Sequence, residues 1–288
     1  MFFNFIINIY ISLFNSKKLF FTLVISWILI LLFTYFILPP AADDMFYFWP
    51  TLNFFYENRI GMYEGDTFVT TYFQFPTYSI INSYFLKIIS FFDIQLTLLS
   101  YKLFNKILLI FLFILSFYWI RINSEKKSFY LKINTFLILI TFTPFTLGLI
   151  GSARPEFLGI IFTLLSLIFF SSEKNFLKIV LSGFFLGLAF TVHPQFFTIA
   201  SVTALVMVIE IYFKSKNFKL IFIFSLFFSM PIILLFYWYY LGYPLSLDFI
   251  FNRVDYIGEN PIINLENNLI NLIKQSLFLT DSPIYTQI

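Results

Sequence analysis

Two adjacent carboxylates, Asp43 and Asp44, are the first side chains in the sequence that could do chemistry. They stand directly after an apolar run and directly before the aromatic stretch MFYFW. A carboxylate beside an aromatic band is more basic than one in open water, so either acid could serve as a general base. In the alternative interpretation the pair only supplies polar groups to a loop, as acids outside a membrane commonly do.

A second stretch whose side chains could take part in chemistry is GSARPEF at residues 151–157. It places Arg154 and Glu156 in a short turn between two apolar runs. A guanidinium can bind a phosphate through two parallel hydrogen bonds, so Arg154 could hold a phosphate at a lipid surface. A local salt bridge between Arg154 and Glu156 is the alternative, because arginine side chains commonly extend toward the membrane interface.

The third stretch is TVHPQF at residues 191–196, which contains the only histidine of the chain, His193, and Gln195 two positions later. Imidazole is a frequent acid–base group near neutral pH, which makes His193 a candidate for the site. A single histidine at a helix end is more often a capping or interfacial residue, and this is the alternative interpretation.

The elements that must position these groups are membrane helices, because 60% of the 288 residues are apolar and only 11% are charged. Five apolar runs are long enough to cross a bilayer, and two shorter ones are either thin or broken spans or a re-entrant pair. The five lie at about 19–38, 103–120, 133–150, 195–213 and 220–241, and the shorter two at about 157–171 and 179–192. We therefore predict an all-α fold, a polytopic transmembrane helical bundle with about seven spans. The chain has no cysteine, which excludes disulfides, cysteine-ligated metals and thiol catalysis.

The distribution of charge predicts the orientation of the bundle. If the N-terminus is inside, eleven of the eighteen lysines and arginines fall in short inner segments, whereas twelve of the fifteen acids fall outside. The eleven are Lys17, Lys18, Arg121, Lys126, Lys127, Lys132, Lys174, Lys178, Lys214, Lys216 and Lys219. This arrangement puts the DD, RPE and HPQ motifs at the outer ends of their spans, where one shared site is geometrically reachable.

Two regions outside the spans complete the predicted organisation. A transmembrane domain of residues 1–241 contains a long first outer loop, residues 39–101, in which Met45–Asn58 and Thr77–Phe92 have the mixed pattern of helices lying in the interface. Residues 242–288 are predicted to form an extracytoplasmic tail with an amphipathic stretch at Asn264–Leu279.

The order of five segments carries a resemblance to a known family. The sequence contains, in this order, DDMFYF, NFFYENRIGMY, YFQFPTYSIINSYFLKI, SARPEF and GFFLGLAFTVHPQ, and the resemblance covers about residues 20–200. Together they resemble the GT-C membrane glycosyltransferases, in particular the bacterial branch related to protein O-mannosyltransferases and aminoarabinose transferases. The chain departs from that pattern in having Asp-Asp where Asp-Glu is commoner, one proline at Phe75-Pro76 where two are frequent, and fewer spans. It is expected to be either a short member or a fragment that lacks C-terminal spans.

The resemblance implies an activity and a role for each candidate residue. A sugar would pass with inversion from a polyprenyl-phosphate-linked donor to a glycan, lipid or protein acceptor at the outer face of a bacterial cytoplasmic membrane. Asp43 would be the general base, and Asp44 would orient the acceptor or help to hold a divalent cation. Arg154 would neutralise the departing phosphate and Glu156 would fix its rotamer. The remaining candidates, His193 and Gln195, would contact phosphate or sugar. The implied partners are these substrates and the lipid bilayer, with no nucleic acid.

Two other classes of protein compete with this interpretation. A lipid or sugar transporter, or a flippase, would carry charged groups near the middle of its spans, whereas the apolar runs are almost free of charge. A non-catalytic scaffold predicts that Asp43, Arg154 and His193 do not converge.

Overall fold

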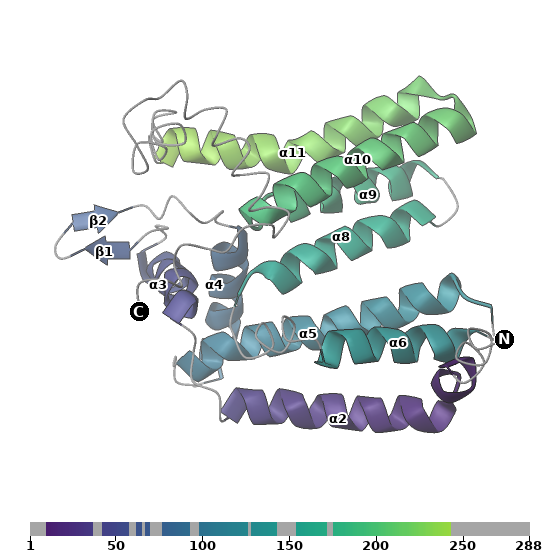
Figure 1. Cartoon of the computed structure of the whole chain (residues 1–288). Helices are drawn as coiled ribbons and strands as arrows, with labels where there is room; N and C mark the ends of the chain where they lie inside the picture. Colours follow the sequence, from purple (N-terminus) through teal and green to yellow (C-terminus); the bar gives the residue numbers. More distant parts are fainter. Residues whose placement is uncertain are drawn as a thin grey trace, which may run out of the picture. The chain divides into compact units, whose positions relative to one another are not determined.

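The fold is known from a computed structural model that describes residues 10–36, 42–57, 62–64, 67–69, 77–92, 98–125, 128–142, 154–171 and 175–242. Almost all of these residues are helical (Figure 1). The helices are α2 (Lys17–Phe36), α3 (Ala42–Glu57), α4 (Thr77–Ser90), α5 (Leu98–Ile122), α6 (Phe129–Phe142), α8 (Glu156–Ser171), α9 (Phe176–Phe190), α10 (Pro194–Ser215) and α11 (Phe218–Gly242).

The prediction of a helical membrane protein is confirmed at this coarse level. Four helices in the described residues are long and apolar enough to cross a bilayer: α2, α5 over Ser100–Ile122, α10 over Gln195–Ser215 and α11 over Phe218–Tyr237. Within the described residues, the apolar parts of α6, α8 and α9 (Phe129–Leu139, Glu156–Ser171 and Phe176–Phe190) are shorter than a typical span. The count of about seven spans therefore stays a prediction.

Both helices expected within residues 39–101 are present, whereas the position of this segment as an outer loop stays a prediction. Helices α3 and α4 begin and end within a few residues of the predicted Met45–Asn58 and Thr77–Phe92. An antiparallel hairpin of β1 (Met62–Glu64) and β2 (Thr67–Val69), which was not predicted, lies between them in sequence. Its signal is nevertheless present, because Gly65-Asp66 is a dipeptide typical of two-residue hairpin connections.

The contacts of the backbone divide the chain into two compact units. The N-terminal unit consists of Met1–Thr71 and Tyr78–Leu164, and the C-terminal unit of Tyr72–Thr77 and Leu165–Ile288. The sequence had predicted one transmembrane domain over residues 1–241 and did not reveal this division. The predicted tail, residues 242–288, lies outside the described residues after its first position.

Helices α2, α5 and α6 pack side by side in the N-terminal unit (Figure 1). The rings of Trp27 and Phe113 lie 5.0 Å apart at the middle of α2 and α5. At one end of the bundle Phe20 contacts Phe117 with ring centroids 6.1 Å apart. Because Phe20 lies in the first turn of α2 whereas Phe117 is near the end of α5, the two helices run antiparallel, as consecutive membrane spans joined by a loop on one side do.

The segment before α2 is fixed to α6 by polar contacts at the same end of the unit. The side-chain amide of Asn134 donates to the backbone carbonyls of Phe14, at 2.6 Å, and Ser16, at 2.9 Å. Asn134 is fully buried. A buried amide that satisfies two backbone acceptors ahead of a helix supplies hydrogen bonds that the apolar surroundings cannot.

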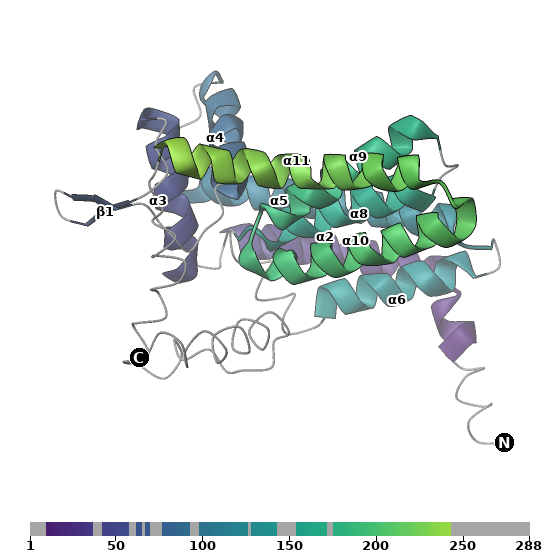
Figure 2. The same ribbon diagram turned by 90° about the horizontal axis from the view of Figure 1, so that it is seen from above.

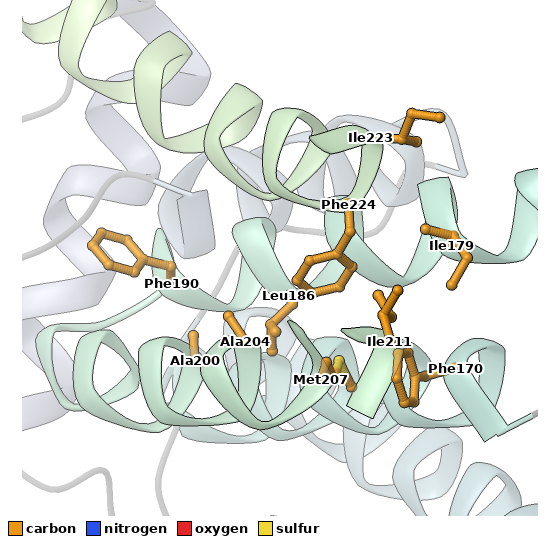
Figure 3. Packing of buried hydrophobic residues seen from close by; sticks show 10 residues of the cluster. All are labelled: Phe170, Ile179, Leu186, Phe190, Ala200, Ala204, Met207, Ile211, Ile223 and Phe224. Atoms are coloured by element: carbon orange, nitrogen blue, oxygen red, sulfur yellow. The ribbon is translucent and has the colours of Figure 1, made fainter. Parts of the chain in front are cut away.

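Helices α9, α10 and α11 form the core of the C-terminal unit, with α9 packed against both of the others (Figure 2). Leu186, Met207 and Phe224, one from each helix, belong to the central cluster of buried side chains (Figure 3). The approach of α9 to α11 is close because Gly183 and Gly187 present no side chain there. A Cβ at Gly187 would lie 2.2 Å from the carbonyl oxygen of Phe228, and one at Gly183 only 2.6 Å from that of Phe224.

Candidate functional site

The acidic pair lies in the first turn of α3. Asp43 and Asp44 follow Ala42, the first residue of the helix, where the partial positive charge of a helix terminus favours acids. The side chains of both aspartates lie outside the part of the chain that the structure describes, so their predicted catalytic roles stay predictions.

Aromatic contacts hold α3 in the N-terminal unit one helical turn after the two acids. The ring of Tyr47, four positions after Asp43, lies 5.9 Å from that of Tyr78 on α4. The ring of Phe48, four positions after Asp44, lies 5.2 Å from that of Tyr101 on α5. The backbone that carries the acids is therefore anchored on α4 and α5.

A buried hydrogen-bond chain continues from this aromatic cluster to the RPE motif. The hydroxyl of Tyr78 donates to Oδ1 of Asn105 at 2.9 Å, and Nδ2 of Asn105 donates to the backbone carbonyl of Arg154 at 3.0 Å. Tyr78 and Asn105 are both 0% exposed. One amide thus joins α4 and α5 to Arg154, two residues before α8 begins. Sequence reasoning did not select Asn105, because nothing in its local surroundings marks it.

Arg154 and Glu156 form an ion pair, with Nη2 of the guanidinium 2.8 Å from Oε1 of the carboxylate. The arginine side chain keeps 26% of its surface exposed, whereas the glutamate side chain keeps 7%. The predicted local salt bridge is therefore present. The same contact is the one through which Glu156 would fix the rotamer of Arg154. Glu156 also stands in the first turn of α8, where a carboxylate is favourable.

Two buried lysines on α5 were missed as site residues. Lys102 is 2% exposed and Lys106 is 6% exposed, and both belong to the candidate span that begins at Ser100. The ammonium of Lys106 donates to Oγ1 of Thr34, near the end of α2, at 2.9 Å. The sequence had left both lysines among the outer cations. Their spacing of four residues, running into an apolar stretch, was the signal that could have identified them.

His193 caps α10, as the alternative interpretation of its motif proposed. Its Nδ1 accepts a hydrogen bond from the backbone N–H of Gln195 at 3.3 Å, and Pro194 fills the first helical position. With Nδ1 as the acceptor, a neutral imidazole carries its proton on Nε2. The preceding turn is fixed by the hydroxyl of Thr77, which donates to that of Thr191 at 2.9 Å.

The predicted site residues are distributed over both units. Asp43, Asp44, Arg154 and Glu156 belong to the N-terminal unit, and His193 and Gln195 to the C-terminal unit. Their convergence on one site stays a prediction. No three His, Asp or Glu side chains in the described residues come close enough together to hold a metal ion, a statement that does not extend to the aspartates of α3.

Comparisons with known proteins give no significant match to a protein-family model, a curated protein or a solved structure. The fold and the apolar helices define the class of the chain as a helical membrane protein.

Proposed function

We propose that the chain is a membrane glycosyltransferase that moves a sugar from a polyprenyl phosphate to an acceptor at the outer face of a bacterial cytoplasmic membrane. One observation supports this proposal above the others. The helix α3, which carries Asp43 and Asp44 in its first turn, is anchored on Tyr78, and Tyr78 is joined through Asn105 to Arg154. A candidate base and a candidate phosphate ligand thus belong to one packed unit.

The chemistry requires the two groups to act on opposite ends of the bond that is exchanged. Asp43 takes the proton of the acceptor hydroxyl as its oxygen attacks the sugar carbon, and the lipid phosphate leaves from the opposite face with inversion. Arg154 stabilises the charge that develops on the departing phosphate, a contact of the kind that can lower a barrier by about 3 kcal/mol. Asp44 orients the acceptor hydroxyl or helps to hold a divalent cation.

The test replaces each aspartate separately. Asp43→Asn keeps the shape of the side chain but cannot accept a proton, so transfer should fall roughly a hundredfold or more while the protein still inserts. Release of polyprenyl phosphate from a polyprenyl-phosphate sugar, with an acceptor extract, is the measurement. Unchanged release in both Asp43→Asn and Asp44→Asn would refute a carboxylate base in this motif, whereas loss in Asp44→Asn alone would exchange their roles.

A second variant separates the phosphate ligand from the base. Arg154→Lys keeps a positive charge but loses the two-pronged contact of the guanidinium, so the KM for the donor should rise together with a fall in kcat. Lys214→Gln is the matched control, since Lys214 is an exposed cation that pairs with Glu210 on the same helix. A parental KM in Arg154→Lys would contradict the assignment of Arg154.

A lipid transporter or flippase is the second candidate function, and Lys102 and Lys106 favour it. Charged groups inside a membrane span are characteristic of substrate paths, and both lysines are buried within a candidate span. A transporter would move a fluorescent polyprenyl phosphate across proteoliposomes and make no glycosidic bond. A transferase would consume the sugar donor without net movement of lipid.

A further inference from the structure

We infer that Lys102 and Lys106 of α5, together with Arg154, form a binding site for a phosphate group carried by a lipid. The inference rests on the proposed function in taking that lipid to be the polyprenyl phosphate donor. It adds to the proposed function two cations on a span that the RPE motif does not contain.

The burial of the two lysines sets them apart from the other cations of the N-terminal unit. At the opposite end of α2 and α5 the described cations Lys17, Lys18, Arg121 and Lys132 are all exposed. Exposed cations at helix ends satisfy the charge rule for membrane topology. Lys102 and Lys106 retain 2% and 6% of their surface, which is costly for an ammonium inside a span and marks these residues as functional candidates.

The depth of Lys106 is greater than that of a lysine which merely flanks a span. It lies six residues after Ser100, the start of the candidate span, which is about 9 Å along the axis at about 1.5 Å per residue. Its ammonium is held by the hydroxyl of Thr34 on the neighbouring span. Lys106 is therefore directed toward α2 and is not extended along its own helix toward the surface.

Asn105 ties the backbone of Arg154 to the segment of α5 that carries both lysines. This residue stands between the lysines in sequence, and its amide holds the carbonyl of Arg154 at 3.0 Å. Residues three and four apart share a helix face, so Lys102 lies next to both Asn105 and Lys106 on α5. The side chain of Arg154 is 26% exposed while its Nη2 pairs with Glu156, so part of it remains accessible to a ligand.

The chemistry of the group favours phosphate over other anions. The lipid phosphate that is left after transfer is a monoester with several oxygens and up to two negative charges, which match two ammonium groups and a guanidinium better than a single carboxylate does. The donor itself is a phosphodiester with one negative charge, so the three cations suit the departing phosphate best. The lipid portion follows from the surface that continues the span. Ile107, Ile110 and Phe111, in the turns after Lys106, are 43%, 46% and 43% exposed, so an apolar chain can leave the site along hydrocarbon.

Binding of farnesyl phosphate to the purified full chain in detergent tests the inference, with farnesol and inorganic phosphate as comparison ligands. Lys102→Met and Lys106→Met keep the apolar stem of each side chain and remove its charge, so the protein should stay folded. Each variant should bind farnesyl phosphate at least tenfold more weakly than the parent. Lys18→Gln, which removes an exposed cation of the same unit, should leave the affinity unchanged.

Several results would overturn the inference. If both methionine variants bind farnesyl phosphate with the parental affinity, the lysines do not form the site. If farnesol binds as tightly as farnesyl phosphate, the site does not recognise the phosphate group. If inorganic phosphate binds as tightly as farnesyl phosphate, the lipid chain contributes nothing to binding and the ligand need not be a lipid. If one methionine variant does not fold, the other decides by the same measurement, and Lys102→Gln and Lys106→Gln decide if neither folds.

The outcome for the proposed function is measured separately, because the binding experiment contains no sugar. A chain that binds farnesyl phosphate through its lysines and transfers no sugar would contradict only the transferase. A chain that transfers sugar, and whose methionine variants keep the parental KM for the donor, would contradict only the lysine site.

Discussion

The side-chain amide of Asn105 on α5 donates at 3.0 Å to the backbone carbonyl of Arg154, which lies 49 positions later and just before α8. The same amide accepts from the hydroxyl of Tyr78 through its oxygen. Asn105 therefore fixes the start of α8 by contacts that do not depend on the guanidinium itself. A substitution at Asn105 can therefore disturb the position of Arg154 while the charge of the arginine stays the same.

Replacing Asn105 should destabilise the N-terminal unit. In Asn105→Leu the hydroxyl of Tyr78 and the carbonyl of Arg154 both lose this partner in a dry interior, so the free energy of unfolding should fall by about 2 to 3 kcal/mol. Thermal or denaturant unfolding in detergent measures the change. Asn123→Leu is the control, since Asn123 makes a similar bond to the carbonyl of Trp119 at 3.0 Å in an exposed position. Equal losses in the two variants would show that burial of the network contributes nothing.

The close packing of α9 and α11 predicts the effect of a single methyl group. In Gly187→Ala the new Cβ would meet the carbonyl oxygen of Phe228 at 2.2 Å and Cδ of Pro231 at 3.0 Å. Backbone cannot yield as a flexible side chain does, so the helices must separate, and we expect a loss of about 1 to 3 kcal/mol in unfolding free energy.

The expected loss of stability in Gly187→Ala is informative because helix propensity alone predicts a gain. Alanine is intrinsically a better helix former than glycine by about 1 kcal/mol. Ser225→Ala on the exposed face of α11 is the control and should stay within about 0.5 kcal/mol of the parent. A more stable Gly187→Ala variant would contradict the close approach seen at this position.

Capping and ligand binding by His193 can be separated with two variants. His193→Asn keeps a side chain that accepts from the N–H of Gln195, whereas His193→Ala removes the cap and should cost about 1 kcal/mol of stability. If the imidazole also contacts the sugar donor, both variants should lose donor affinity although only the alanine variant is less stable. Parental transfer in His193→Asn would limit the role of His193 to the cap.

Local sequence patterns predicted the helices well because each helix is set by its own apolar run and caps. The boundaries of α3 and α4 and the cap at His193 follow from such short-range signals. The buried position of Lys106 was missed because the hydropathy of a segment does not indicate which of its side chains face a neighbouring span. Thr34, its partner, is seventy-two positions earlier in the chain.

The candidate site was less accessible to sequence reasoning than the helices. The salt bridge of Arg154 with Glu156 joins residues two apart, and it was anticipated as one of two interpretations. Asn105 was not anticipated, because its contacts to Tyr78 and Arg154 depend on how three segments fold together. Gly183 and Gly187 were overlooked for the same reason, since a glycine that permits helix contact looks like any other in sequence.

The predicted orientation of the membrane domain can be tested at two positions that the structure exposes. Phe91, directly after α4, is 85% exposed, and Lys18 in the first turn of α2 is also exposed. The charge rule places Phe91 outside and Lys18 inside. Phe91→Cys should react with a membrane-impermeant maleimide in intact cells, whereas Lys18→Cys should react only after permeabilisation. The parent has no cysteine and supplies the background. The reverse pattern would place Asp43 and Arg154 on the cytoplasmic side, where an outward-facing transferase could not use them.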